Sequence, residues 1–94
     1  MDPSSPASYF WRGIAKAPNK SALVDFHQAI ELKHPQPHLV YVQLGMLHDD
    51  WRDYDAAIKN FKKAAESSSD EYIKNLLNLS IEQKADREKR ASRK

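Results

Sequence analysis

Two segments of this 94-residue chain carry the same apolar pattern at helical spacing. Residues three and four apart share one face of a helix. Each segment places two alanines around a phenylalanine on such a face, namely Ala22, Phe26 and Ala29 in the first and Ala57, Phe61 and Ala64 in the second. A pattern that recurs after roughly 34 residues is typical of helical-repeat proteins, in which each unit buries its apolar face against the next.

A glycine precedes each of these segments and lies within an apolar helical run, YFWRGIAKA for Gly13 and YVQLGMLHD for Gly45. Glycine inside a helix costs about 1 kcal/mol relative to alanine. This cost is explained if a second helix lies directly against the glycine backbone. The sequence therefore predicts two antiparallel helical hairpins, each with its glycine packed against the stripe that contains Phe26 or Phe61.

The periodicity and the helix-start and helix-stop signals predict an all-α chain with five helices. Four helices are expected at residues 6–16, 20–33, 37–50 and 54–67, and a final helix at about 70–88. Ser5 and Asp53 are the expected N-caps of the first and fourth helices, and Ser68 with Glu71 has the form of a capping box for the last. Residues 1–5 are expected to be a disordered leader, and residues 84–94 a basic extension that frays or projects.

The motifs of the two units resemble those of the tetratricopeptide repeat family over roughly residues 6–83. The matching positions are Tyr9-x2-Arg12-Gly13, Ala22-x3-Phe26 and Pro35 in the first unit, and Tyr41-x2-Leu44-Gly45 and Ala57-x3-Phe61 in the second. The resemblance implies antiparallel hairpins stacked as a short right-handed solenoid. Repeat 1 would cover about 6–36 and repeat 2 about 37–69, followed by a capping helix.

Composition argues against several classes of function. The chain has no cysteine, so it can form neither a disulfide nor a thiolate metal site. No run approaches the ~20 apolar residues of a membrane span. The N-terminal residues also lack the basic start and apolar stretch of a secretory signal. We therefore expect a cytoplasmic protein.

No arrangement of polar residues predicts a catalytic or metal site. His34 and His38 have the spacing of paired metal ligands on a helix, but the prolines at 35 and 37 prevent a helix there. They are expected to be exposed turn histidines. Asp49, Asp50 and Asp53 are expected to form a solvated turn. The sequence thus predicts a protein that is not an enzyme and that has no metal and no other cofactor.

The resemblance implies a protein or peptide segment as the partner, because the family usually binds one along the concave surface formed by the first helix of each repeat. Carried onto this sequence, the partner-binding residues would be Phe10, Trp11, Ile14, Leu39, Val42, Gln43, Met46, Lys74, Leu77, Asn78 and Ile81. Such a surface is mostly apolar and would suit an amphipathic helix or an apolar peptide. Alternatively, Phe10, Trp11 and Leu77 close on one another and leave no groove.

Two further functions remain open from the sequence. The first is self-association as a homo-oligomer, through the apolar end of the stack and through Trp51, which lies in a polar turn. The second is contact with nucleic acid or a membrane surface through the basic extension, which holds six Lys or Arg residues. The second is the weaker hypothesis, because Asp86 and Glu88 interrupt the cations and no aromatic residue lies among them.

Overall fold

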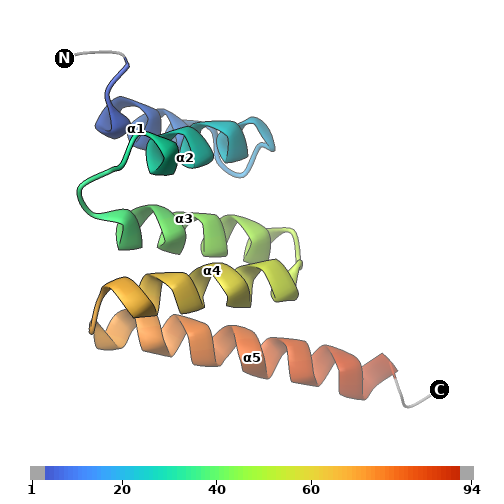
Figure 1. Ribbon diagram of the computed structural model, residues 1–94. Coiled ribbons are helices and arrows are strands. Elements are labelled where there is room, and N and C mark those ends of the chain that lie inside the picture. The colour runs from blue at the N-terminus through green and yellow to red at the C-terminus, as the bar shows by residue number, and fades with distance from the viewer. Residues whose placement is uncertain (1–3, 92–94) are drawn as a thin grey trace.

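The computed structural model describes residues 4–91, and this part of the chain is entirely helical with no strand. Its five helices are α1 (Pro6–Lys16), α2 (Ser21–Glu31), α3 (Pro37–Asp50), α4 (Tyr54–Ser67) and α5 (Glu71–Ala91). Each helix contacts the next along the chain, which gives an elongated stack of 53 × 29 × 17 Å (Figure 1). The all-α prediction is confirmed, and the helix bounds differ from the predicted ones by three residues at most, at the end of α5.

Helix starts follow the capping chemistry of the sequence at two of the three predicted positions. The Ser5 hydroxyl accepts a hydrogen bond from the Ser8 N–H at 3.2 Å, and the Asp53 carboxylate accepts one from the Ala56 N–H at 3.4 Å. The predicted capping box at Ser68 is wrong. Asp70 takes that role by accepting a hydrogen bond from the Tyr72 N–H at 3.0 Å, because α5 begins later than the box requires.

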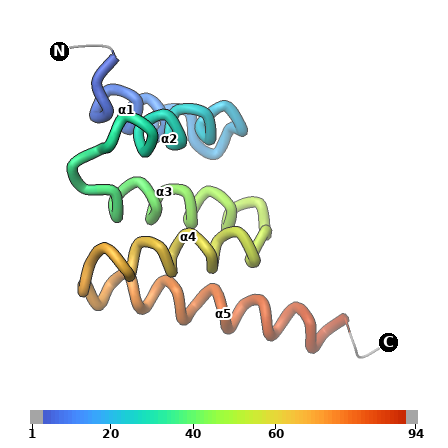
Figure 2. The backbone as a smooth tube through the Cα atoms, viewed as in Figure 1, coloured from blue at the N-terminus to red at the C-terminus, as the bar shows by residue number. Residues whose placement is uncertain are grey.

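Helices α2 and α3 end in the same way, with a non-glycine residue in the left-handed conformation. Lys33 has φ 60° and Arg52 has φ 61°. The next N–H closes each helix by donating to a carbonyl five residues back, from His34 to Ala29 at 3.0 Å and from Asp53 to His48 at 2.9 Å. This is the Schellman arrangement, in which glycine is the usual left-handed residue. Figure 2 shows the sharp change of chain direction after each helix.

The two hairpins, α1–α2 and α3–α4, share the same central contact. A Cβ atom added at Gly13 would lie 2.7 Å from Cε1 of Phe26, and one added at Gly45 would lie 2.5 Å from Cε1 of Phe61. No side chain could occupy either position without displacing the ring. The prediction that each glycine packs against the second helix of its hairpin is therefore confirmed.

Helix α3 belongs to both halves of the apolar core. Its residues Val40, Leu44 and Leu47 are buried with the α1–α2 hairpin in a first cluster, around Phe26. Its residue Val42 faces the other way, into a second cluster with α4 and Ile73 of α5. The stack therefore has no single central core, and α3 connects one apolar layer to the next.

The basic C-terminal segment was expected to fray or project, but its described part, residues 84–91, does neither. Residues 84–91 continue α5 and lie against the turn between α3 and α4. The Lys84 ammonium is 2.5 Å from a carboxylate oxygen of Asp55, and Nη1 of Arg87 donates to the Arg52 carbonyl at 2.8 Å. The rest of the predicted extension, at 92–94, and residues 1–3 of the predicted leader lie outside the described residues.

Candidate functional site

The surface expected to bind a partner is partly exposed and partly core. Four of its large apolar residues are exposed: Trp11 at 60%, Leu39 at 38%, Met46 at 40% and Ile81 at 43%. The polar residues Lys74 and Asn78 are also exposed, whereas Ile14, Gln43 and Leu77 are half-buried. Phe10 and Val42 are buried. The exposed apolar residues come from α1, α3 and α5, which are the first helix of each hairpin and the final helix.

Phe10 and Val42 are corrections to the predicted site. Phe10 is 7% exposed and packs its ring against Phe26 and His34 in the first core cluster. Val42 is 9% exposed and belongs to the second cluster, with Phe61. Both side chains point into the layers between helices and are unable to contact a partner. Trp11 remains at the surface, where its ring meets the edge of Phe10 at a centroid distance of 5.5 Å.

The most regular part of this surface is the outer stripe of α3. Leu39, Gln43 and Met46 lie on one face of the helix, since they are four and three residues apart. Leu39 and Met46 are exposed, and Gln43 lies half-buried between them. The stripe is uncharged, so a partner that covers it would not have to desolvate an ion. Leu77, which is half-buried against the second core cluster, and Ile81 extend the apolar surface on α5.

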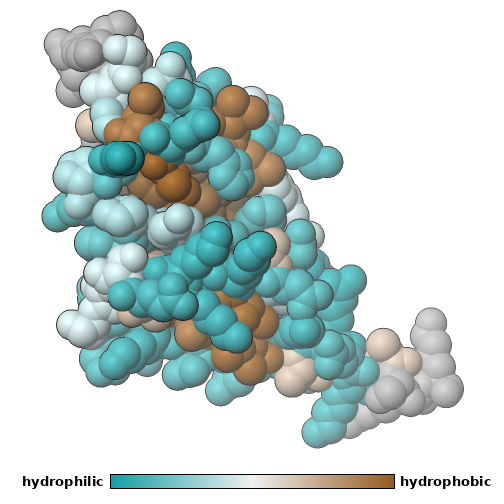
Figure 3. Space-filling model, in the orientation of Figure 1, coloured by the Kyte–Doolittle hydropathy of each residue, from teal (hydrophilic) through white to brown (hydrophobic). Residues whose placement is uncertain are grey.

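Sequence reasoning missed a second set of exposed apolar residues. They are Val24 on α2, Leu32 directly after α2, and Tyr72 and Leu79 on α5, and they are 39–70% exposed. Leu32 is exposed because α2 ends at Glu31 and Leu32 is its C-cap. Tyr72 and Leu79 are seven residues apart, and this heptad spacing was the available signal. In the view of Figure 3, apolar surface gathers over α1–α2 and again toward α4–α5, with hydrophilic surface between the two areas.

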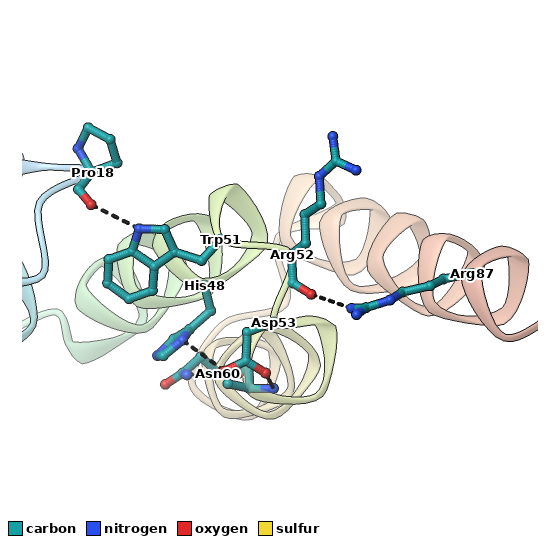
Figure 4. Close-up of polar contacts among 8 residues, drawn as sticks. Pro18, His48, Trp51, Arg52, Asp53, Asn60 and Arg87 are labelled. Atoms are coloured by element: carbon teal, nitrogen blue, oxygen red, sulfur yellow. Dashed lines mark hydrogen bonds and ion pairs between the residues drawn. The ribbon is translucent and has the colours of Figure 1, made fainter. Parts of the chain in front are cut away.

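The turn between α3 and α4 is held on both sides. Trp51 was expected to be available for docking elsewhere, but its indole Nε1–H donates to the Pro18 carbonyl at 3.0 Å (Figure 4). The indole also meets the His48 ring edge-on, and Nδ1 of His48 lies 3.6 Å from the Asp53 carboxylate. Because Arg87 binds the Arg52 carbonyl, this one turn connects the first hairpin to α5.

The remaining histidine and aspartate residues give no metal-binding geometry. His34 is buried, contrary to expectation, and its Nδ1 accepts a hydrogen bond from the Gln36 N–H at 3.0 Å. Burial, and then the neighbouring charge of Asp50, raises the pKa of the Asp49 carboxyl above its usual 3.8, so the turn is less solvated there than expected. Within residues 4–91, no three His, Cys, Asp or Glu side chains are grouped so that they could hold a metal ion.

The helices in the described part of the chain are too short or too polar to cross a membrane. Comparisons with protein-family models, with curated proteins and with solved structures find no match to this chain.

Proposed function

We propose that this chain is a short tetratricopeptide-type repeat protein that acts as a non-catalytic interaction module. The proposed partner is a protein segment that binds along the surface formed by α1, α3 and α5. Two facts support the repeat assignment. The motifs recur in register, and the two hairpins place a glycine against a phenylalanine in the same way.

A single observation carries the proposed function: Trp11, Leu39, Met46 and Ile81 leave large apolar side chains exposed on successive alternate helices. Exposed apolar residues scattered singly need no explanation, but a contiguous apolar set is typical of an interaction surface, and the proposal is that these residues on alternate helices form one. Tryptophan and methionine are enriched at protein interfaces, and the flexible methionine thioether adapts to different partners.

The chemistry of the surface restricts the partner. The stripe on α3 is uncharged, and the exposed polar groups beside it, Lys74 and Asn78, are on α5. Lys74 lies 3.8 Å from Glu71, an exposed contact that contributes little to stability and would not prevent a partner from binding Lys74. An amphipathic helix with apolar residues three and four apart would match the α3 stripe and place its polar face in water.

The test compares two variants that each replace one exposed apolar residue with a charge. Met46→Glu changes the proposed surface, and Val24→Glu changes α2, where Val24 is 70% exposed. Both variants should keep the helical circular dichroism of the wild type, because neither side chain is in a core cluster. The proposal requires that a partner captured from the native source by the wild type is lost with Met46→Glu and retained with Val24→Glu. Loss with both variants, or with neither, would contradict it.

Self-association is the second candidate, and it is favoured by the apolar residues Tyr72 and Leu79 on α5. These side chains are 55% and 50% exposed at the end of the stack, where no further helix follows among the described residues. Repeat stacks normally cover such an end with a polar face. Light scattering over a range of concentrations, with Leu79→Glu as the control, decides between a dimer and a monomer. A wild type that stays monomeric at high concentration removes this candidate.

A further inference from the structure

The exposed face of α3 ends in two adjacent carboxylates. Asp50 lies four residues after Met46 and seven after Gln43, so it continues the α3 stripe on the same face of the helix. Asp50 is exposed, whereas Asp49 lies to one side of the stripe and is half-buried. The α3 stripe therefore changes from apolar to acidic within one helical turn of Met46.

The charge on Asp49 is unfavourable in the folded protein for three reasons. Its Oδ1 is enclosed and has no hydrogen-bond partner among residues 4–91. Burial, and then the charge of Asp50, raises the pKa of the Asp49 carboxyl above its usual 3.8. Both carboxylates also lie in the last turn of α3, where the negative end of the helix dipole disfavours anions.

No cation within residues 4–91 offsets these two charges. The ion pairs of this part of the chain join other residues, and neither Asp49 nor Asp50 has a Lys, Arg or His within ion-pair distance. Arg52, the nearest cation along the chain, pairs with neither of them. A buried polar group that folding leaves without a partner calls for a specific explanation. Here a positive group supplied from outside would stabilise both carboxylates.

We propose that the partner segment is a basic amphipathic helix with a Lys or Arg that contacts the carboxylates of Asp49 and Asp50. The apolar residues of this helix cover Leu39 and Met46. This inference rests on the function proposed above and specifies its partner. Four residues of α-helix span about 6 Å, so the partner's cation lies about one turn beyond the apolar residue that covers Met46.

The acidic end of the stripe disfavours other occupants of the same surface. A nucleic acid or an acidic peptide would bring negative charge against the two carboxylates, and like charges placed together are strongly unfavourable. A neutral amphipathic helix would cover Leu39 and Met46 but would leave both carboxylates uncompensated. A cation beside the exposed Asp50 stabilises Asp49 as well, through its charge, without reaching the enclosed oxygen.

The chain offers a matched pair of variants for the test. Asp50→Asn removes one negative charge at the end of the α3 stripe. Glu31→Gln removes one from the last residue of α2, which is also exposed but does not belong to the surface of α1, α3 and α5. Both variants should fold, because loss of an anion from a helix C-terminus is favourable. Asp50→Lys reverses the charge at the proposed contact.

The probe is a fluorescein-labelled peptide of about 16 residues, built from Ala and Gln with three leucines at i, i+4 and i+7 to favour an amphipathic helix. Three versions carry Lys, Gln or Glu one turn before the first leucine and one turn after the last, so that either orientation presents this residue to Asp50. Affinities are measured by anisotropy at about 0.05 M salt.

We expect the wild type to bind the Lys peptide about fivefold more tightly than the Gln peptide, the upper range for an exposed ion pair. The net charge of the chain is +2, so overall attraction would favour the Glu peptide instead. Asp50→Asn should remove most of the preference for Lys, Glu31→Gln should retain it, and Asp50→Lys should favour the Glu peptide. Binding of the Lys peptide should also lower the pKa of Asp49, followed by carbon-13 NMR of its carboxyl.

Two results would overturn this inference and leave the proposed surface intact, provided that Met46→Glu abolishes peptide binding. The first is equal or weaker binding of the Lys peptide relative to the Gln peptide. The second is a preference for Lys that Asp50→Asn retains, or that Glu31→Gln reduces as much as Asp50→Asn does. Failure of all three peptides to bind, or binding that Met46→Glu leaves unchanged, would contradict the proposed surface itself and this inference with it.

Discussion

Replacing Gly45 with alanine adds one methyl group at the point where α3 lies closest to α4. In an unobstructed helix, this change would stabilise the protein by about 1 kcal/mol. Here the new Cβ would lie 2.5–2.8 Å from three ring carbons of Phe61. Because that ring is only 2% exposed, it cannot swing into solvent. The helices must separate or the ring must leave its rotamer, and overpacking of this kind costs about 3 kcal/mol at the upper end of its usual range.

Together, the two effects lower the free energy of unfolding by about 2 kcal/mol. For a domain of this size, this corresponds to a fall in Tm of about 10 °C. The assay is urea unfolding followed by circular dichroism at 222 nm, where a lower midpoint with an unchanged slope reports lost stability. The control is the same change in a Phe61→Leu background, where the smaller side chain should remove most of the cost. A Gly45→Ala protein as stable as the wild type would refute the packing argument, as would an equal cost in both backgrounds.

Three other substitutions should change stability in defined directions, each measured by urea unfolding. Trp51→Phe keeps an aromatic ring but loses the hydrogen bond to the Pro18 carbonyl, and it should cost about 0.5–1 kcal/mol; no change would mean that the bond is not formed in solution. Asp49→Asn should stabilise the protein at pH 7 by about 0.5 kcal/mol, because it removes a negative charge from the last turn of α3. Since the pKa of Asp49 is raised in the folded state, its unfavourable charge appears as pH rises above 3.8, so the advantage of asparagine should vanish in acid. Lys33→Gly should raise the free energy of unfolding by about 1 kcal/mol, because glycine adopts the left-handed backbone of this position without strain. A less stable Lys33→Gly protein would show that the backbone at Lys33 is not strained.

Most of the secondary structure could be predicted from the sequence because local signals determine it. Pro6 and Pro37 occupy first-turn positions, and Ser5 and Asp53 supply caps, so three helices begin where these residues require. The contact of Gly45 with a second helix was also predictable, because an unsupported glycine in an apolar helix would carry a cost without a compensating gain.

The candidate surface was less predictable because it depends on how each helix is rotated about its axis. Tyr9, Phe10 and Trp11 are consecutive aromatic residues, and a helix directs consecutive side chains about 100° apart. The positions of α2, the α2–α3 loop and α3 relative to α1 decide that Phe10 is buried and Trp11 exposed. Local patterns carry no information on that placement.

The C-terminal segment illustrates a second limit. Lys84 and Arg87 follow Ile81, the last large apolar residue of α5, in a segment with the composition of a solvated helix end. Lys84 contacts Asp55, 29 residues earlier at the start of α4, and Arg87 contacts the carbonyl of Arg52, 35 residues earlier on the α3–α4 turn. A backbone carbonyl is present at every residue, so no sequence pattern marks the one that Arg87 binds.

Site-specific crosslinking tests the proposed interaction surface most directly. Because the chain has no cysteine, single-cysteine variants can be labelled at one chosen position with a benzophenone. Met46→Cys places the label on the α3 stripe, and Val24→Cys places it on α2 as a control of greater exposure. The account predicts that a partner protein is crosslinked from position 46 and not from position 24. Crosslinking from position 24 alone, or equal crosslinking from both, would contradict it.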